Sequence, residues 1–408
     1  MPQEFPAAER LATRDDILDL VRGLSALAVL LSHARNFFLK DFGELADPGP
    51  MAKIFYLLSG LGHQAVMVFF VLSGYFVGGS VLSGLQSGRF SWSRYSLARL
   101  SRLWVVLVPA LLLTLVCDLS GRWLAGPAAY AGSLHGVFGQ GPSASQPGVL
   151  GPSVFVGNLL FLQTVHFPIY GSNGPLWSLA YEFWYYAIFP LLAVALYPCQ
   201  AKLGGKARSL LIRILMLAAA VALLWFLPRE LVRGGLVWLF GTGVWWIARR
   251  PWFQPCIGSR IWFGVGGLVF AATLAGCKLG LAGCSGFVIG LAFAAWLPSL
   301  LGSWRFPAPF KALATALADH SYTLYVVHFP ILFFLGAVIA KGRQFDFGGT
   351  GIVVVIGSCV LSLLLTRVCW LCFESKTERV RLWAAGFLPK TPASPANHEV
   401  DLPAARIA

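Results

Sequence analysis

Long apolar runs are the feature that most restricts what this chain can fold into. A scan for stretches of about 20 residues, the length that crosses the hydrocarbon core of a bilayer as a helix, finds ten of them. They lie near residues 17–39, 54–82, 97–119, 175–198, 209–228, 231–249, 260–277, 283–302, 320–341 and 350–374. Only 12% of the residues are charged, which is about half the share in an ordinary soluble domain. The sequence therefore predicts an all-α, polytopic integral membrane protein with ten transmembrane helices.

The distribution of Lys and Arg predicts how these helices are oriented. With ten spans, the segments on the side of the N-terminus hold 20 of the 31 basic residues, and the opposite side holds eight. Positive residues collect in cytoplasmic loops, so both termini are expected in the cytoplasm. The net charge of +14 is then explained by helix flanks. Because the sequence contains no nucleic-acid-binding motif, no nucleic-acid partner is expected.

Three segments lie outside the membrane helices of the predicted domain, residues 17–374. Residues 1–16 form a cytoplasmic segment that is polar and acidic, unlike a signal peptide, and residues 375–408 form a polar cytoplasmic tail expected to be disordered. Residues 120–174 form an external loop, rich in Gly, Pro and Ser, that is large enough for a lid or a binding surface. Its apolar stretch 153–169 is short, so it is predicted to be re-entrant or interfacial, with an eleventh span as the alternative.

The cysteines do not suggest a metal site. Most of the eight lie inside apolar stretches, and Cys369 and Cys372, three residues apart on one apolar helix, are interpreted as packing residues. No metal and no permanently bound cofactor is predicted.

Ionisable side chains inside a membrane span are costly and therefore mark candidate functional positions. Arg22 and His33 in the first span are eleven residues apart, which places them on one helix face about 16.5 Å apart along the axis. Asp19, three residues before Arg22, is its expected salt partner at the cytoplasmic end. Simpler interpretations exist for both residues: Arg22 can anchor the inner end of the helix at the interface, and His33 can hydrogen-bond between helices.

Glu182 is the only acidic residue between Asp118 and Glu230, and it lies about two turns inside the fourth span. A carboxylate at that depth must be protonated, paired or in contact with water. Counted from the outer ends of their spans, Glu182 and His33 lie at similar depths. A contact between them is therefore predicted, which would orient the imidazole as a general base. A structural pairing of Glu182 with an Arg or a Tyr is the alternative.

Further candidates lie in the ninth span and at the start of the fourth. His328 has Tyr325 one turn before it, and a packing role for this histidine is the alternative. Asn173 and Trp177 belong to the sequence NGPLW that leads into the fourth span. Aromatic side chains of this kind can stack on sugars but also populate membrane interfaces.

Four sequence blocks resemble a known family. Residues 18–33 (LDLVRGLSALAVLLSH), with their Arg and His eleven apart, are similar to the first-helix signature of membrane acyltransferase family 3, the bacterial O-acetylase type. The blocks 69–79 (FFVLSGYFVGG), 175–192 (PLWSLAYEFWYYAIFPLL) and 321–331 (SYTLYVVHFPI) resemble three further family blocks in the same order. The chain departs from the family pattern in two places. Phe183 stands where a second acid is often found, and Ser375-Lys376 replaces the basic-Pro pair that commonly follows Glu374, so no role is assigned to Glu374.

The resemblance implies an O-acyltransferase of the bacterial cytoplasmic membrane. It would move an acyl group, usually acetyl, from cytoplasmic acyl-CoA to a hydroxyl of a carbohydrate or lipid-linked glycan of the cell envelope or exopolysaccharide. Under this interpretation His33, supported by Glu182, is the catalytic base, or is itself acylated. Arg22 would steady the CoA near the inner face. The candidates for substrate binding are Arg22, His328, Tyr325, Trp177 and Asn173.

Two other function classes compete with this interpretation. A secondary transporter or flippase could use Arg22, His33 and Glu182 as an intramembrane relay, although the sequence has no evident internal repeat of the kind on which many transporters are built. A non-catalytic sensor or scaffold would tolerate the loss of Glu182. The sequence indicates no oligomeric state.

Overall fold

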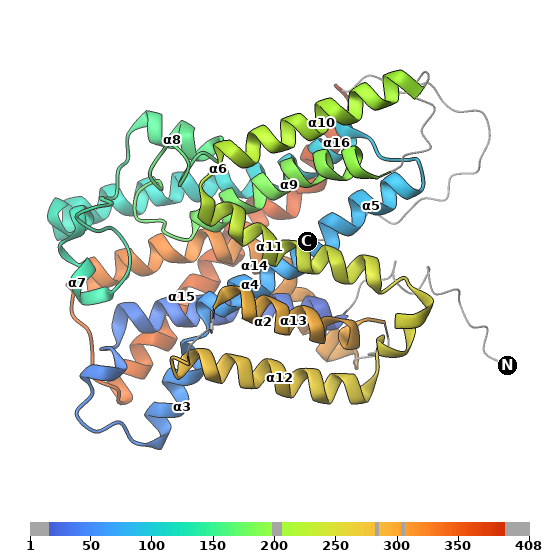
Figure 1. Ribbon diagram of the computed structural model, residues 1–408. Coiled ribbons are helices and arrows are strands. Elements are labelled where there is room, and N and C mark those ends of the chain that lie inside the picture. Colours follow the sequence, from blue (N-terminus) through green and yellow to red (C-terminus); the bar gives the residue numbers. More distant parts are fainter. Residues whose placement is uncertain (1–15, 198–205, 282–284, 303–306, 388–408) are drawn as a thin grey trace.

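The computed structural model describes residues 16–197, 206–281, 285–302 and 307–387, and over these residues the protein is all-helical. In chain order the α-helices are α2 (Asp16–Phe38), α3 (Pro50–Ser59), α4 (Gly62–Ser73), α5 (Gly79–Gln86), α6 (Trp92–Ala125), α7 (His135–Phe138), α8 (Pro152–Leu159), α9 (Leu176–Leu196), α10 (Lys206–Phe226), α11 (Arg229–Ile247), α12 (Arg260–Lys278), α13 (Gly286–Leu300), α14 (Ala308–Phe334), α15 (Gly349–Cys372) and α16 (Thr377–Ala385). Short 3-10 or π turns are η1 (Phe42–Glu44), η2 (Gly74–Gly78), η3 (Ala129–Ser133), η4 (Pro251–Cys256), η5 (Leu335–Ile339) and η6 (Glu374–Lys376). Figure 1 shows the long helices as one bundle.

Eight helical segments in the described part of the chain are long and apolar enough to cross a membrane. Over its described residues each of the ten predicted spans is mainly helical, but two of the helices are too short or not apolar enough to count as membrane spans. Helix α13 has 15 residues, fewer than the roughly 20 that a bilayer needs, and α11 carries Arg229, Glu230 and Arg233 in its first turns. The prediction of a multi-pass, all-α membrane protein is confirmed, with eight rather than ten helices that qualify by length and composition.

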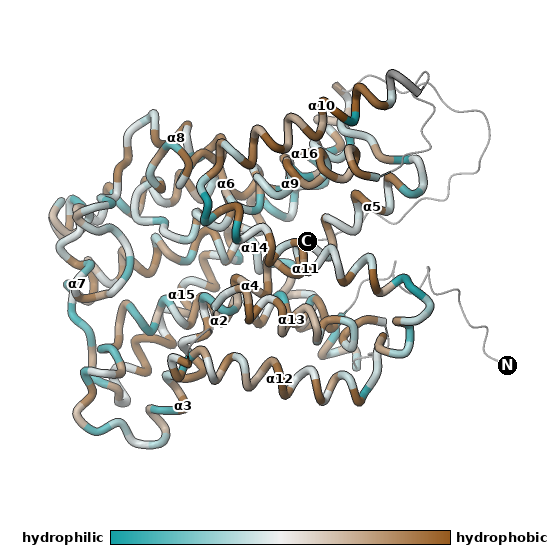
Figure 2. The backbone as a smooth tube through the Cα atoms, in the orientation of Figure 1, coloured by the Kyte–Doolittle hydropathy of each residue, from teal (hydrophilic) through white to brown (hydrophobic). Residues whose placement is uncertain are grey.

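The helices divide into a buried centre and an exposed periphery. In the most apolar window of the segment Pro50–Gln86, 78% of residues are buried, and the corresponding values for α2 and the segment Ala308–Ile339 are 61% and 67%. In α10 and α12 only 6% of the window is buried, and the tube in Figure 2 is brown, or hydrophobic, along much of both. Because exposed apolar surface of this extent is stable against lipid tails and not against water, α10 and α12 face the bilayer.

Close packing of α4 and η2 against α11 fixes one side of the buried centre. A Cβ atom at Gly74 would lie 1.8 Å from the carbonyl oxygen of Trp238, and a Cβ at Gly241 would lie 1.8 Å from that of Val71. Glycine at both positions lets the two backbones approach closely, as small residues do between membrane helices. This contact brings Ser73, next to the π turn η2, beside Trp238.

The segment 126–175, here called the cap, connects α6 to α9. It begins later than the predicted external loop, because α6 continues to Ala125. Its helix α8 has eight residues, or about 12 Å, which is too short for an eleventh span, and the re-entrant or interfacial location of residues 153–169 stays a prediction. The buried Asn158 holds the cap together, since its amide donates to the carbonyl of Pro168 and accepts from the backbone N–H of Tyr170.

The C-terminal segment contains more structure than predicted. Disorder was expected from residue 375, yet η6 and α16 follow α15 directly, and α16 packs against α6. Leu382, Trp383 and Phe387 are exposed, whereas Arg381 is partly buried. Helix α16 is therefore amphipathic, which a search for long apolar runs does not detect. Residues 1–15 and 388–408, on which the two terminal predictions also fall, lie outside the described residues.

Candidate functional site

A cavity rich in arginine lies at the end of the bundle where α2 begins. Its volume is about 230 Å³, and its lining comes from α2, α6, α14, α15, η6 and α16. The charged residues of this arginine cavity are Arg22, Arg99, Arg102, Arg381, Asp319, Glu374 and Glu378. Four guanidinium groups at one cavity suit an anionic ligand such as a phosphate, which arginine binds with its planar fork of donors.

Several of these side chains form ion pairs, cation–π contacts or hydrogen bonds with other residues of the protein. Arg22 pairs with Asp19 at 3.3 Å, so the predicted salt partner is confirmed. The guanidinium of Arg102 lies 5.5 Å from the ring centre of Tyr322. Glu374, to which the sequence assigned no role, accepts hydrogen bonds from the backbone N–H and the hydroxyl of Thr323 and so ties the end of α15 to α14.

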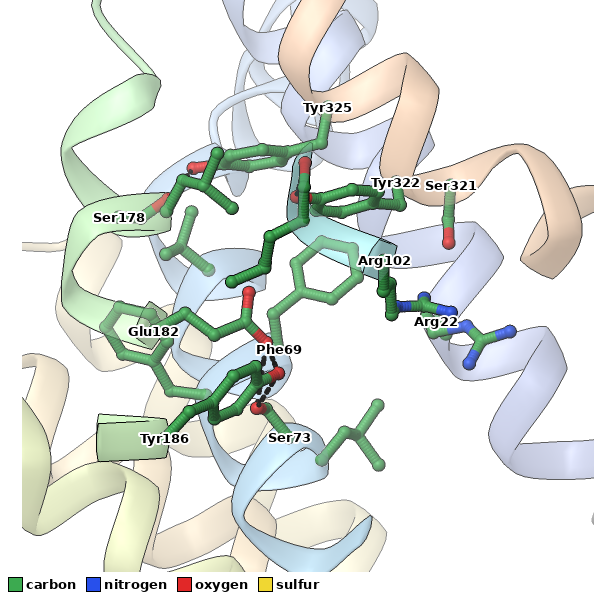
Figure 3. A pocket seen from close by; sticks show the side chains of 15 residues that line it. Arg22, Phe69, Ser73, Arg102, Ser178, Glu182, Tyr186, Ser321, Tyr322 and Tyr325 are labelled. Atoms are coloured by element: carbon green, nitrogen blue, oxygen red, sulfur yellow. Dashed lines mark hydrogen bonds between the residues drawn. The ribbon is translucent and has the colours of Figure 1, made fainter. Parts of the chain in front are cut away.

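A smaller cavity of about 70 Å³ adjoins the first one in the middle of the bundle. Figure 3 shows it between Glu182 on one side and Arg22 and Arg102 on the other. These two arginines line both cavities, and the remaining walls of this central cavity are largely apolar, including Phe69 and Leu103. The two cavities therefore share their arginine boundary.

Among the residues that the structure describes, the hydrogen bonds to the carboxylate of Glu182 reach one of its two oxygens. Its Oε1 accepts from the hydroxyl of Ser73 at 2.9 Å and from the hydroxyl of Tyr186. The indole N–H of Trp238 in turn donates to Ser73 Oγ at 3.0 Å. In Figure 3 the other carboxylate oxygen points away from Ser73 and Tyr186. Glu182 is thus held rigidly, with one oxygen available to the cavity that it lines.

His33 of α2 and His328 of α14 form a pair, which lies closer to the C-terminal end of α2 than Arg22 does. The ring centres of His33 and His328 are 5.3 Å apart, and Phe329 packs edge-on against His33 at 4.9 Å. His328 is fully buried, whereas His33 is partly exposed. Nδ1 of His33 lies 2.7 Å from Oε1 of Gln140 in the cap. The sequence predicted both histidines separately, and the packing of α2 along α14 brings them together.

The predicted contact between His33 and Glu182 is wrong. Among the described residues, His33 bonds Gln140 and Glu182 bonds Ser73 at the central cavity, whose lining contains neither histidine. The amide of Asn173, just before α9, donates to the carbonyl of Val326, two residues before His328. Helix α9 therefore starts near the level of the histidines along the bundle, and Glu182 lies about 9 Å farther along the helix.

Buried polar residues hold the start of α9 at that depth. Asp118 of α6 accepts hydrogen bonds from the backbone N–H of Ser172 at 2.7 Å and from its hydroxyl at 2.6 Å. The amide of Asn173 also donates to the hydroxyl of Thr114. Asn173, a candidate for substrate binding, thus occupies both of its donors in joining α6, α9 and α14.

The other two substrate-binding candidates lie in different surroundings. Tyr325 lines the central cavity, bonds Ser178 through its hydroxyl at 2.7 Å, and has its ring centre 6.1 Å from that of His328. It therefore connects the central cavity to the histidine pair. Trp177 instead packs against Phe70 and Tyr181, outside the linings of both described cavities.

Sequence reasoning missed several residues of the site. Arg99 and Arg102 were counted as topological charges, and only the packing of α6 against α14 and α16 shows that they line a cavity. Gln140 is a neutral loop residue that no helical pattern marks. Among the residues that the structure describes, there is no group of three or more His, Cys, Asp or Glu that could hold a metal ion.

These features follow one another along the bundle. The arginine cavity adjoins the mostly apolar central cavity, and Tyr325 of the central cavity lies beside His328 of the histidine pair. An imidazole can take a proton from a hydroxyl or act as a nucleophile, and the arginines can hold the anionic part of a second substrate. The chemistry available is therefore group transfer between an anionic donor and a second molecule at the histidines.

Comparison with known proteins identifies the family. A family model described as an acyltransferase domain matches residues 15–371, from α2 almost to the end of α15. No curated protein and no solved structure matches the chain. The match covers the central cavity, the histidine pair and the cap, whereas the part of the arginine cavity lined by η6 and α16 lies beyond it. Because the matched segment is most of the chain, the protein belongs to acyltransferase family 3.

Proposed function

We propose that the protein transfers an acyl group, acetyl in the simplest case, from cytoplasmic acyl-CoA to a hydroxyl of a carbohydrate or lipid-linked glycan at the outer side of the bacterial cytoplasmic membrane. Membership of the family supports acyl transfer. The assignment of a donor site and an acceptor site is based on the positions of Arg22 and His33 on α2. Arg22 lines both cavities and His33 lies three turns farther along the helix, so a single helix connects the two substrates.

The arginine cavity is the proposed site for the nucleotide end of acyl-CoA. This part of the donor carries several phosphate charges, and Arg22, Arg99, Arg102 and Arg381 line the cavity. Bidentate contacts between guanidinium and phosphate groups are among the strong charge-assisted hydrogen bonds. The cavity is about three times as large as the central one (about 230 against 70 Å³), an order that agrees with a broad nucleotide end and a narrow pantetheine arm.

The central cavity is the proposed site for the pantetheine arm. Its walls are mostly apolar, and the free oxygen of Glu182 can accept a hydrogen bond from one of the amide N–H groups of pantetheine. Glu182 is then a donor-binding residue rather than the partner of His33. Tyr325, between this cavity and His328, would contact the thioester end.

The reaction is proposed to take place at His33. Its ring nitrogen removes the proton of the acceptor hydroxyl, the oxygen attacks the thioester carbon, and the C–S bond breaks to release CoA as the thiolate, which takes up the proton. If His33 is acylated first, the same proton balance holds over two steps. His328 lies beside His33 and contributes to binding of the acceptor.

The proposed orientation has both termini in the cytoplasm. The arginine cavity lies at the end of the bundle where α2 begins, and the cap lies at the other end, with α3 (Figure 1). Cys277, at the C-terminal end of α12, is disulfide-bonded, and disulfides form in oxidising compartments outside the bacterial cytoplasm. Because α12 ends on the same side of the bundle as α3, this supports an external position for the cap.

The experiment that tests the proposal uses the full chain in liposomes with labelled acetyl-CoA and the surface glycan fraction of the host. We expect His33→Ala to lower kcat for acetyl transfer by at least about 1000-fold, as the loss of a general base does. His166→Ala, which changes a histidine in the cap away from the pair, is the matched control. Mass spectrometry of surface glycans from cells with and without the protein then identifies the acceptor.

Two outcomes would contradict the proposal. Normal acetyl transfer by a folded His33→Ala protein would exclude His33 as the base. Movement of lipid or solute across liposomes of the pure protein, with no dependence on acyl-CoA, would favour a transporter or flippase that uses Arg22, His33 and Glu182 as a relay.

A further inference from the structure

Gln140 reaches from the cap to His33 and contacts it at two points. Its Oε1 lies 2.7 Å from His33 Nδ1, and its Nε2 donates to the backbone carbonyl of His33 at 3.0 Å. Asn36, one turn along α2, donates its amide to the same Oε1 at 3.4 Å. The glutamine side chain is therefore fixed at both ends on one turn of α2.

The sequence around Gln140 aims it at this helix. Phe138 is buried against Phe37 and Phe333, with ring centres 5.2 and 6.1 Å away. Gly139 and Gly141, on either side of the glutamine, have φ values of +62° and +82°, a region that residues with a side chain rarely adopt. The segment Phe138-Gly139-Gln140-Gly141 thus anchors the cap and turns Gln140 toward His33.

These contacts define which nitrogen of His33 carries the proton. A carbonyl oxygen can only accept, so the atom of Gln140 that faces the His33 carbonyl must be the amide nitrogen. The other end, which faces Nδ1, is then the oxygen, and Nδ1 must donate to it. Neutral His33 is therefore the Nδ1–H tautomer, with the lone pair on Nε2.

His328 is fixed in the same tautomer by a different group. Its Nδ1 lies 2.8 Å from the backbone carbonyl of Leu324 and donates to it. Its Nε2 is buried without a hydrogen-bond partner. A buried imidazole nitrogen left unpaired costs free energy, so a hydrogen-bond donor on a ligand at this position would be favoured. Both histidines therefore have Nε2 as the acceptor nitrogen, and their ring centres are 5.3 Å apart.

We propose that Gln140 is a positioning residue that holds His33 as the Nδ1–H tautomer and so leaves Nε2 as the catalytic base. This rests on the proposed role of His33 in acyl transfer. Because Gln140 belongs to the cap, His33 is fixed only while the cap is seated on α2. The cap is then part of the catalytic machinery, and not simply a lid over the acceptor. An amide does this without adding a charge next to the imidazole.

The test compares three variants of the full chain in liposomes. Gln140→Leu keeps the size of the side chain and removes both contacts, and we expect kcat for acetyl transfer to fall about 100-fold, with little change in KM for acetyl-CoA. Gln140→Glu keeps an acceptor for Nδ1–H but loses the donor to the His33 carbonyl, so kcat should fall less than in Gln140→Leu and stay within about tenfold of the wild type. The control is Gln163→Leu, because Gln163 is also buried in the cap and also donates to a helix carbonyl, that of Leu176, but does not contact His33.

The tautomer is measured independently of activity by ¹⁵N NMR of histidine-labelled protein, with the His33 signals assigned from the His33→Ala spectrum. We expect a protonated Nδ1 and a bare Nε2 in the wild type, and loss of this single form in Gln140→Leu. A wild-type His33 protonated at Nε2, equal losses in Gln140→Leu and Gln163→Leu, or a kcat of Gln140→Leu within twofold of wild type would each overturn the inference. Failure of the proposed function is distinguishable from failure of this inference. In that case His33→Ala would keep its activity, while the NMR spectra of the wild type and of Gln140→Leu would still show the expected tautomers.

Discussion

The arginine cavity and the histidine pair differ in the kind of side chain that surrounds them. The arginine cavity is lined by Arg22, Arg99, Arg102 and Arg381 and by carboxylates from α14, η6 and α16. The histidine pair instead contacts uncharged groups, namely the amide of Gln140, the ring of Phe329 and the backbone carbonyl of Leu324. Charges bind an anionic donor, whereas uncharged hydrogen-bond partners can orient an imidazole as a base. The comparison indicates that recognition of the donor and proton transfer are separated along α2.

The central cavity lies between these regions, and replacing Glu182 tests whether it binds the donor arm. We expect Glu182→Ala to lower kcat/KM about 30-fold, because a hydrogen bond to a charged group contributes about 1.5–3 kcal/mol. The loss should be the same for acetyl-CoA and for acetyl-pantetheine, which lacks the nucleotide. Steady-state kinetics with the two donors measures it, and Glu230→Ala, which removes an exposed carboxylate paired with Arg233, is the control.

A different result would revise the comparison. If Glu182→Ala affected acetyl-CoA alone, the carboxylate would act through the nucleotide site. If the kinetics with both donors were unchanged in a folded protein, Glu182 would be a structural residue held by Ser73 and Tyr186.

The Arg381→Ala variant tests the arginine cavity through a residue outside the family match. Arg381 lines the cavity from α16, and loss of one phosphate contact should raise KM for acetyl-CoA about tenfold, or about 1.4 kcal/mol. KM for acetyl-pantetheine should not change, and the difference between the donors should shrink at high salt because salt screens exposed charges. Arg379→Ala is the control, since Arg379 is exposed on the same helix. Equal effects on both donors would show that α16 does not bind the nucleotide.

Much of this arrangement could be predicted from the sequence, because a charged side chain in an apolar run has few explanations. Arg22 and Glu182 stood out for that reason, and the bond between Asp19 and Arg22 followed from helical spacing. The depth of Glu182 could not be predicted, because it depends on contacts of Asp118 and Asn173 with residues far away in the chain. Gln140 could not be found either, since an uncharged residue in a loop carries no periodic signal.

The smallest expected effect concerns Trp238, which donates a hydrogen bond to Ser73, the residue that donates to Glu182. Trp238→Phe removes the indole N–H that donates to Ser73 Oγ and keeps the packing of an aromatic ring against α4. A neutral hydrogen bond contributes about 0.5–1.5 kcal/mol, so we expect kcat/KM to fall about threefold for both donors, a weaker form of the Glu182→Ala pattern. Trp245→Phe, in the same helix near η2, is the control, because Trp245 packs against Gly79 rather than Ser73. If kcat/KM fell with acetyl-CoA only, Trp238 would act through the arginine cavity instead. The nucleotide and the pantetheine arm would then not bind in two separate cavities, as we propose.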